Sequence, residues 1–202
     1  MDEVGLIKEA QRGDLDAFNR LVLAYQDRVY NQAYRVLGNH QSADDATQEA
    51  FISAYRKISS FRGGSFRAWL LRIVTNACYD ELRRQKRRPT TALEPVDEND
   101  EEIESPYWIA DPGELPEEQA VRSELGNAIQ ECLNQLSNEF RMVVVLVDVQ
   151  GLDYQEASDV IGKPLGTIKS RLARARYQMR DCLQSFWELL PHSMRLETND
   201  KY

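Results

Sequence analysis

The sequence predicts an all-α protein made of two small helical domains joined by an acidic flexible linker. Its 202 residues suffice for two small domains, and 42% of them are apolar, so a core can form. Apolar residues recur at spacings of three and four in both halves of the chain, which is the pattern of helices with one buried face. Five of the seven prolines lie between the halves. We therefore expect a domain over 1–88, a linker over 89–116, a second domain over 117–190 and a tail over 191–202.

The first domain begins with an apolar stripe that indicates one long buried helix. Gly38 should end this helix, because glycine tolerates the left-handed conformation common at helix C-termini. Ser42 can cap the next helix, which would run to about Ile58 with Asp44 and Asp45 in its first turn. The stripe consists of Phe18, Leu21, Val22, Tyr25, Val29, Ala33, Val36 and Leu37.

A third amphipathic helix is expected over 66–84, after a glycine-containing flexible segment at 61–65. The second domain is also helical in pattern, with one ambiguous piece. Residues 142–149 are rich in β-branched side chains and, taken alone, suggest a buried strand. The apolar residues around this piece keep helical spacing and the domain offers no partner strand, so we expect a helix. These apolar residues are Leu133, Leu136, Phe140, Val144 and Val147.

A short helix followed by a longer basic helix is expected after residue 150. Asp153 and Glu156 resemble a capping box for a helix over 154–161, which Gly162 would end. Pro164 suits the first turn of the following helix. The longer helix would run from about 165 to 179 or as far as 187, with Ile168, Leu172 and Ala175 facing inward and Lys169, Ser170, Arg171, Arg174 and Arg176 facing outward. This is the helix-turn-helix pattern, whose second helix enters the DNA major groove; the alternative is a helical hairpin with a solvated basic face.

The charge distribution supports a nucleic-acid partner despite a net charge of −8. Residues 89–121 hold eleven acidic residues and no base, so the rest of the chain carries +3. Residues 62–88 hold eight bases against two acids, and residues 163–180 hold six bases and no acid. Clustered cations of this kind can neutralise phosphates, although a basic run is also commonly just a solvated face.

The segment 61–88 interleaves aromatic and basic side chains, a combination suited to single strands. Aromatic rings stack on bases while cations follow the backbone. The alternative for any single aromatic is a place in the core, because several of them keep helical spacing. The aromatics are Phe61, Phe66, Trp69 and Tyr79, and the cations include Arg62, Arg67, Arg72, Arg83 and Arg84. On the preceding helix, Asp45, Gln48 and Glu49 share one face, which is either solvated or an acidic docking site.

Other classes of protein are disfavoured by what the sequence lacks. The first residues carry Asp2 and Glu3 and no long apolar run, so we expect neither a signal peptide nor a membrane helix, and a cytoplasmic protein. Cys78, Cys132 and Cys182 lie about fifty residues apart, which argues against a disulfide framework or a zinc cluster. We expect no metal, no cofactor and no enzyme activity, because the chain has no phosphate-binding glycine loop and its two histidines lie outside the informative segments.

Three segments together resemble the extracytoplasmic-function sigma factors, small two-domain members of the bacterial sigma-70 family. They are 43–51 (ADDATQEAF), 66–70 (FRAWL) continuing to Asn76 and Asp80, and 154–157 (YQEA) with 166–176 (GTIKSRLARAR). The resemblance spans about residues 5 to 187. It implies a protein without catalytic residues that binds core RNA polymerase and promoter DNA, and it leaves open an anti-sigma protein as a further partner. The resemblance also implies that the first domain is region 2 and the second is region 4.

The resemblance implies a role for each group of residues. Asp45, Gln48 and Glu49 would bind the polymerase. Arg62, Ser65, Phe66, Trp69, Arg72, Asn76, Arg83 and Arg84 would open and capture the minus-ten element. Thr167, Lys169, Ser170, Arg171 and Arg174 would bind the minus-thirty-five element as duplex. The alternative function is a helix-turn-helix regulator that binds DNA without engaging polymerase, which would leave the first domain and the linker unexplained.

Overall fold

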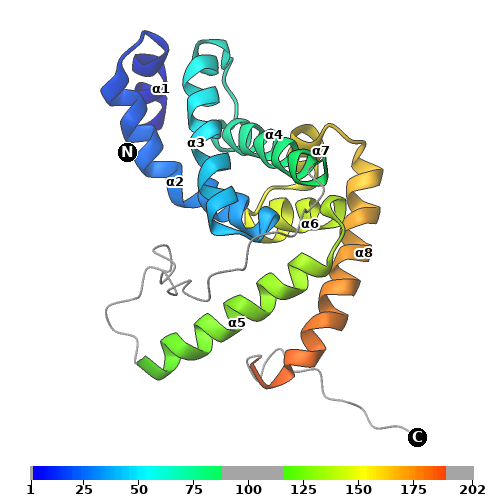
Figure 1. Ribbon diagram of the computed structural model, residues 1–202. Coiled ribbons are helices and arrows are strands. Elements are labelled where there is room, and N and C mark those ends of the chain that lie inside the picture. The colour runs from blue at the N-terminus through cyan, green and yellow to red at the C-terminus, as the bar shows by residue number, and fades with distance from the viewer. Residues whose placement is uncertain (1, 88–115, 190–202) are drawn as a thin grey trace, which may run out of the picture.

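The structure is a computed structural model that describes residues 2–87 and 116–189, and every regular element in these ranges is helical (Figure 1). The predicted all-α class is confirmed. The first unit contains α1 (Glu3–Gln11), α2 (Leu15–Leu37), α3 (His40–Lys57), the 3-10 turn η1 (Ile58–Ser60) and α4 (Phe66–Arg87). The second contains α5 (Pro116–Gln135), α6 (Asn138–Val144), the π-helical turn η2 (Val145–Val149), α7 (Tyr154–Ile161), α8 (Leu165–Leu183) and the 3-10 segment η3 (Gln184–Leu189).

The predicted linker and tail lie outside the described residues, except for Pro116, which is the first residue of α5. None of the described helices combines the length and the apolar character that a bilayer span requires.

The buried stripe of the first unit lies on α2, as the periodicity predicted, and Phe18, Leu21 and Val29 are all buried there. Gly38 ends α2 in the left-handed conformation, with φ 71°, and its N–H donates to the carbonyl oxygen of Tyr34 at 2.8 Å. A polar pair fixes α4 against α2, because the buried Gln32 amide donates to the Thr75 hydroxyl at 2.7 Å.

The predicted cap of α3 was wrong. The N-cap is Asn39, whose side chain accepts a hydrogen bond from the Ser42 backbone N–H at 2.9 Å. Ser42 is therefore inside the first turn, and Asp44 and Asp45 lie beyond it. Asparagine caps as well as serine does, and Asn39 has the extended backbone a cap requires directly after the glycine that ends α2.

The β-branched segment of the second unit is helical, so the strand alternative is wrong. The helix changes character within it: the Gln150 N–H donates to the carbonyl oxygen of Val145 at 2.8 Å, an i to i−5 bond that closes the π-turn η2. Burial explains the composition, because Met142, Val143 and Leu146 are completely enclosed in the core. The β-branched composition of this segment therefore reflects its burial and does not indicate a strand.

The helix-turn-helix has its predicted capping box. The Asp153 carboxylate accepts from the Glu156 N–H at 2.8 Å, and the Glu156 carboxylate accepts from the Asp153 N–H at 3.0 Å. Gly162 ends α7 in the left-handed conformation with φ 70°. The predicted place of Pro164 in the first turn of α8 was wrong by one residue. Pro164 is the N-cap of α8, directly before the first turn, and has an extended ψ of 145°.

A disulfide joins Cys132 of α5 to Cys182 of α8, which the sequence argument had not expected. The spacing of 50 residues carried no sign of it, because the packing of α5 beside the end of α8 brings the two Cα atoms to 5.7 Å. Cys78 is a free thiol in the core of the first unit.

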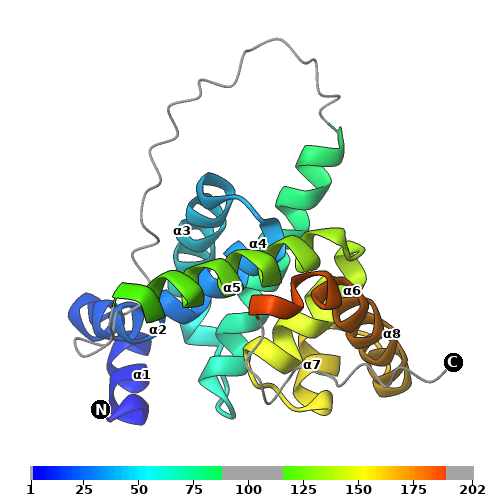
Figure 2. The same ribbon diagram turned by 90° about the horizontal axis from the view of Figure 1, so that it is seen from below.

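The two units share one continuous apolar core and meet at the C-terminal end of α2 (Figure 2). Arg35 of α2 donates to the Gly126 carbonyl and the Gln130 side chain of α5, both at 3.2 Å. Arg141 of α6 donates to the carbonyl oxygen of Val36 at 2.7 Å. The two units also meet where α7 of the second lies beside α4 of the first.

Candidate nucleic-acid interface

The basic helix α8 buries Ile168, Leu172 and Ala175 and leaves its other side in solvent, as predicted. Lys169, Ser170 and Arg174 are exposed, whereas Thr167 is half-buried and its carbonyl oxygen accepts from the Ser170 hydroxyl at 3.1 Å. Thr167, Ser170, Arg171 and Arg174 occupy positions i, i+3, i+4 and i+7 and therefore share one face.

Two arginines of α8 are occupied by carboxylates of the same unit. Arg171, with only 18% of its side chain exposed, pairs with Glu139 at 2.8 Å. Arg176 donates two hydrogen bonds to Asp148 at 3.0 and 2.5 Å, and this pairing raises the pKa of its guanidinium above the ordinary value. Arg176 thus fastens α8 to η2, while Lys169 and Arg174 are exposed.

The turn between α7 and α8 depends on a serine whose role the sequence did not reveal. The Ser158 hydroxyl donates to the carbonyl oxygen of Lys163 at 2.6 Å, and the Ser158 carbonyl accepts from the Gly162 N–H at 2.8 Å. Ser158 is buried, so these bonds hold the turn that sets the angle between the two helices.

One face of α4 carries the aromatic and polar side chains predicted to bind single strands. Trp69, Arg72, Asn76 and Arg83 lie at i, i+3, i+7 and i+14 and share that face. Trp69 is half-buried and the other three are exposed. Arg83 pairs with Asp80 on the same helix, and this exposed pair is easily weakened by water and salt. Arg84 pairs with Glu81, whose side chain is only 12% exposed.

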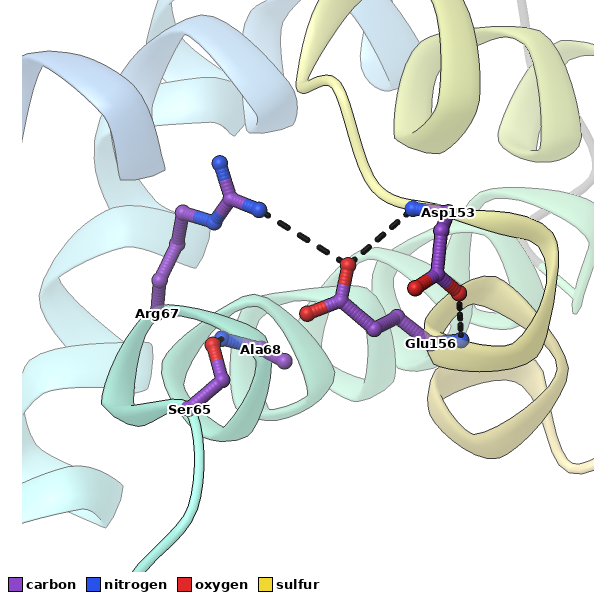
Figure 3. Close-up of polar contacts among 5 residues, drawn as sticks. All are labelled: Ser65, Arg67, Ala68, Asp153 and Glu156. Atoms are coloured by element: carbon purple, nitrogen blue, oxygen red, sulfur yellow. Dashed lines mark hydrogen bonds and ion pairs between the residues drawn. The ribbon is translucent and has the colours of Figure 1, made fainter.

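The other residues of the predicted minus-ten set lie in the core beneath this face, at the start of α4 or in the loop before it. Phe66 is 2% exposed and packs against Phe61 and Trp69, so it is a core residue in this structure. Ser65 caps α4, because its hydroxyl accepts from the Ala68 N–H at 3.1 Å (Figure 3). Arg62 is exposed in the connecting loop, next to two glycines with positive φ.

An ion pair joins α4 to the first helix of the helix-turn-helix, α7. Figure 3 shows Arg67 of α4 reaching toward Glu156 of α7, and the two groups are 3.7 Å apart. The same Glu156 oxygen accepts the capping bond from Asp153. Burial raises the pKa of Tyr79 on α4, and the positive charge of the Arg171 guanidinium on α8 opposes that rise.

The predicted docking face of α3 is solvent-exposed. Asp45, Gln48 and Glu49 all project outward, opposite the buried alanines Ala43, Ala46, Ala50 and Ala54. Small alanines let α3 approach its neighbours closely, so the acidic face stands at a fixed distance from the core.

Arg35 and Arg141 have roles that were not predicted from the sequence. Both are buried, and burial lowers the pKa of each. A usable signal was present, because each arginine lies within an apolar run, and a cation there must find hydrogen-bond acceptors. Over residues 2–87 and 116–189, no three His, Cys, Asp or Glu side chains gather as a metal site would need.

Known proteins show the same two units. Residues 21–88 match the family Sigma-70 region 2, and residues 126–179 match the family Sigma-70, region 4. The ECF RNA polymerase sigma factor SigW of Bacillus subtilis is 38% identical over 179 residues, covering 88% of this chain and 95% of that protein. SigE of Mycolicibacterium smegmatis is 40% identical over 169 residues, covering 84% of this chain but only 62% of that protein.

Solved structures agree with this comparison. The sigma factor RpoE of Bartonella quintana, in complex with the anti-sigma factor NepR, has a TM-score of 0.63 at 25% identity, covering 84% of this chain and 98% of that one. CnrH in complex with the cytosolic domain of CnrY also has a TM-score of 0.63, at 26% identity, covering 91% of this chain and 97% of that one. The chain belongs to the extracytoplasmic-function RNA polymerase sigma factors of the sigma-70 family.

Proposed function

We propose that this protein binds core RNA polymerase and directs it to particular promoters, and that it contributes no catalytic residues of its own. The observation that carries the proposal is the presence, in one chain, of a capped helix-turn-helix (α7 and α8) and of an aromatic and basic face on α4. A DNA-binding regulator needs only the first of these. Work on RNA polymerase would place the protein in the cytoplasm.

The minus-thirty-five element would be bound by the exposed side of α8. Lys169 would neutralise phosphate, and Arg174 is the arginine best placed to bind a base edge because it is exposed and pairs with no carboxylate among residues 2–87 and 116–189. Ser170 and Thr167 lie on the same side. Arg171 would have to leave Glu139 before it could contact DNA, which makes its contribution smaller than its position in the motif suggests.

The minus-ten element would be bound by the face of α4. Trp69 offers a ring for stacking, while Arg72, Asn76 and Arg83 follow the strand. Arg62 and Arg84 would add phosphate contacts. Phe66 and Ser65 would act indirectly, Phe66 by supporting Trp69 from the core and Ser65 by capping the helix.

The remaining roles follow the division into two domains, 1–88 and 117–190, with an acidic linker over 89–116 and a tail over 191–202. The exposed face of Asp45, Gln48 and Glu49 would bind a basic surface of the polymerase. An anti-sigma protein is a further partner suggested by the two solved relatives, each of which is in complex with another protein.

Binding to purified core RNA polymerase tests this proposal. The wild-type chain should co-elute with core enzyme, and the double variant Asp45→Lys with Glu49→Lys should co-elute weakly while keeping its helical circular dichroism spectrum. The matched control is Asp27→Lys with Glu131→Lys, which makes the same charge change at exposed positions of α2 and α5. Equal loss in both double variants would refute the docking face, and no co-elution of the wild type would refute the function.

A further inference from the structure

The disulfide between Cys132 and Cys182 ties the end of the DNA-binding helix to α5. Figure 2 shows the last part of α8 and η3 alongside α5. All three cysteines of the chain are described, and Cys78, the third, is buried in the first unit. The chain therefore has one disulfide and one enclosed thiol.

The bond holds a part of α8 that packing holds only weakly. The buried residues of α8 are Ile168, Leu172 and Ala175, all in its first three turns. Throughout the rest of this fully described helix, side chains are exposed or half-buried. Arg176 pairs with Asp148 and Met179 packs against the core half-buried, whereas Cys182 supplies a covalent anchor near the last residue of α8.

The other end of the bond is well fixed. Cys132 is 1% exposed, on the side of α5 that faces α8. Gly126 and Gln130, on another side of α5, accept hydrogen bonds from Arg35 of α2. The disulfide thus connects α8 to a helix that is itself anchored to the first unit.

We propose that Cys132 and Cys182 form a redox-responsive modification site that sets how firmly α8 is mounted on α5. The inference rests on the proposed function in one respect, the cytoplasmic location. There, thiol reductants keep most cysteines reduced, and disulfides are usually transient or redox-sensing rather than structural. In the oxidised protein α8 is fixed along its whole length, and in the reduced protein its last turns and η3 loosen.

The exchange would start at the half-buried Cys182. A thiolate of a protein dithiol attacks the Sγ atom of Cys182, and Cys132 leaves as a thiolate and takes up a proton. The second thiol of the reductant then releases Cys182, so that two electrons and two protons have passed to the pair and the reductant has become a disulfide. Hydrogen peroxide reverses the change: the two thiols give two protons and two electrons, and the peroxide becomes two water molecules. Cys78 does not compete, because burial raises its pKa to about 12 and keeps the thiol neutral.

Hydrogen–deuterium exchange of the full chain tests directly how firmly α8 is held against α5. Alkylation and mass measurement first confirm which samples are oxidised. Backbone amides of residues 176–189 should exchange on the order of tenfold faster in the reduced protein, while those of α3 stay unchanged. Cys78→Ala should keep this response, and the double variant Cys132→Ala with Cys182→Ala should exchange fast in both conditions. Equal exchange in oxidised and reduced wild type, or failure of the disulfide to form, would overturn the proposal.

Promoter-dependent transcription measures the consequence. With core polymerase, reduction should lower output from a minus-thirty-five-dependent promoter about fivefold, comparable to the loss of one base contact. The double cysteine variant should give the low output under both conditions, which controls for effects of the reductant on the polymerase. Equal or higher output from reduced wild type would refute the functional part. Absence of transcripts in every condition would instead refute the proposed function, and the exchange experiment would still decide the redox site.

Discussion

Replacing Arg141 by methionine should destabilise the protein, because Arg141 joins the two units. Arg141 is 8% exposed, and its guanidinium donates to three backbone carbonyl oxygens: those of Val36 of α2 and Asn134 at 2.7 Å, and that of Leu136 at 3.2 Å. Methionine has a similar length and flexibility but no donor. The substitution leaves these acceptors without their partner and also removes a charge whose burial is unfavourable, as the lowered pKa of Arg141 shows.

The two short bonds dominate the expected magnitude. A hydrogen bond to a charged group contributes about 1.5 to 3 kcal/mol, and removing the desolvation cost of the guanidinium offsets part of the sum. We expect the free energy of unfolding to fall by about 3 kcal/mol. With a urea m-value of about 2 kcal/mol per molar, the midpoint of unfolding would fall by about 1.5 M.

Urea unfolding followed by circular dichroism, with the disulfide kept oxidised in all samples, measures this change. The matched control is Arg20→Met, the same substitution at an exposed position of α2, which should change stability by less than about 0.5 kcal/mol. A loss below about 1 kcal/mol in Arg141→Met, at an unchanged m-value, would show that these bonds contribute little and that the units are held together by their apolar contacts alone.

Three further predictions concern DNA binding, pH and the disulfide. Arg174→Ala should weaken promoter binding of the reconstituted polymerase by about 1 to 3 kcal/mol and relax base preference at one position, which binding across a promoter library would show; an unchanged preference would exclude base contact. Burial and the hydrogen bond to Glu3 raise the pKa of Tyr25 to about 12, so the fold favours the protonated hydroxyl. That stabilisation is complete below about pH 10 and is lost as the pH rises toward 12. Over this range the melting temperature should therefore fall more steeply with pH in the wild type than in Tyr25→Phe, and an equal fall in both proteins would contradict the prediction. Reducing the Cys132–Cys182 disulfide, which closes a loop of 50 residues, should lower the free energy of unfolding by about 4 kcal/mol, measured by urea unfolding. The same unfolding curve for the oxidised and the reduced protein would count against this prediction.

Local signals in the sequence predicted the local structure well. Gly38 and Gly162 ended their helices where expected, and the Asp153 and Glu156 side chains formed their capping box, because each depends on backbone conformation within a few residues. The prediction for the N-cap of α3 was wrong because two residues close together, Asn39 and Ser42, can both cap a helix, and the sequence alone did not distinguish them.

Contacts between distant segments could not be predicted in the same way. The pairing of Arg171 with Glu139 depends on how α6 packs on α8, and the packing angle between two helices cannot be deduced from a single sequence. Phe66 and Trp69 keep the same spacing whether they stack on bases or fill the core, and only packing shows that Phe66 is enclosed. The disulfide belongs to this class too.

Run-off transcription with purified core RNA polymerase is the decisive test of whether this protein selects promoters. Templates would carry a promoter library in which the minus-thirty-five and minus-ten elements vary independently. We expect transcripts that start at defined positions only when this protein is added, with Arg174→Ala changing the base preference at the minus-thirty-five element and Trp69→Ala changing it at the minus-ten element. Transcription from no template, or transcripts that ignore both elements, would contradict it.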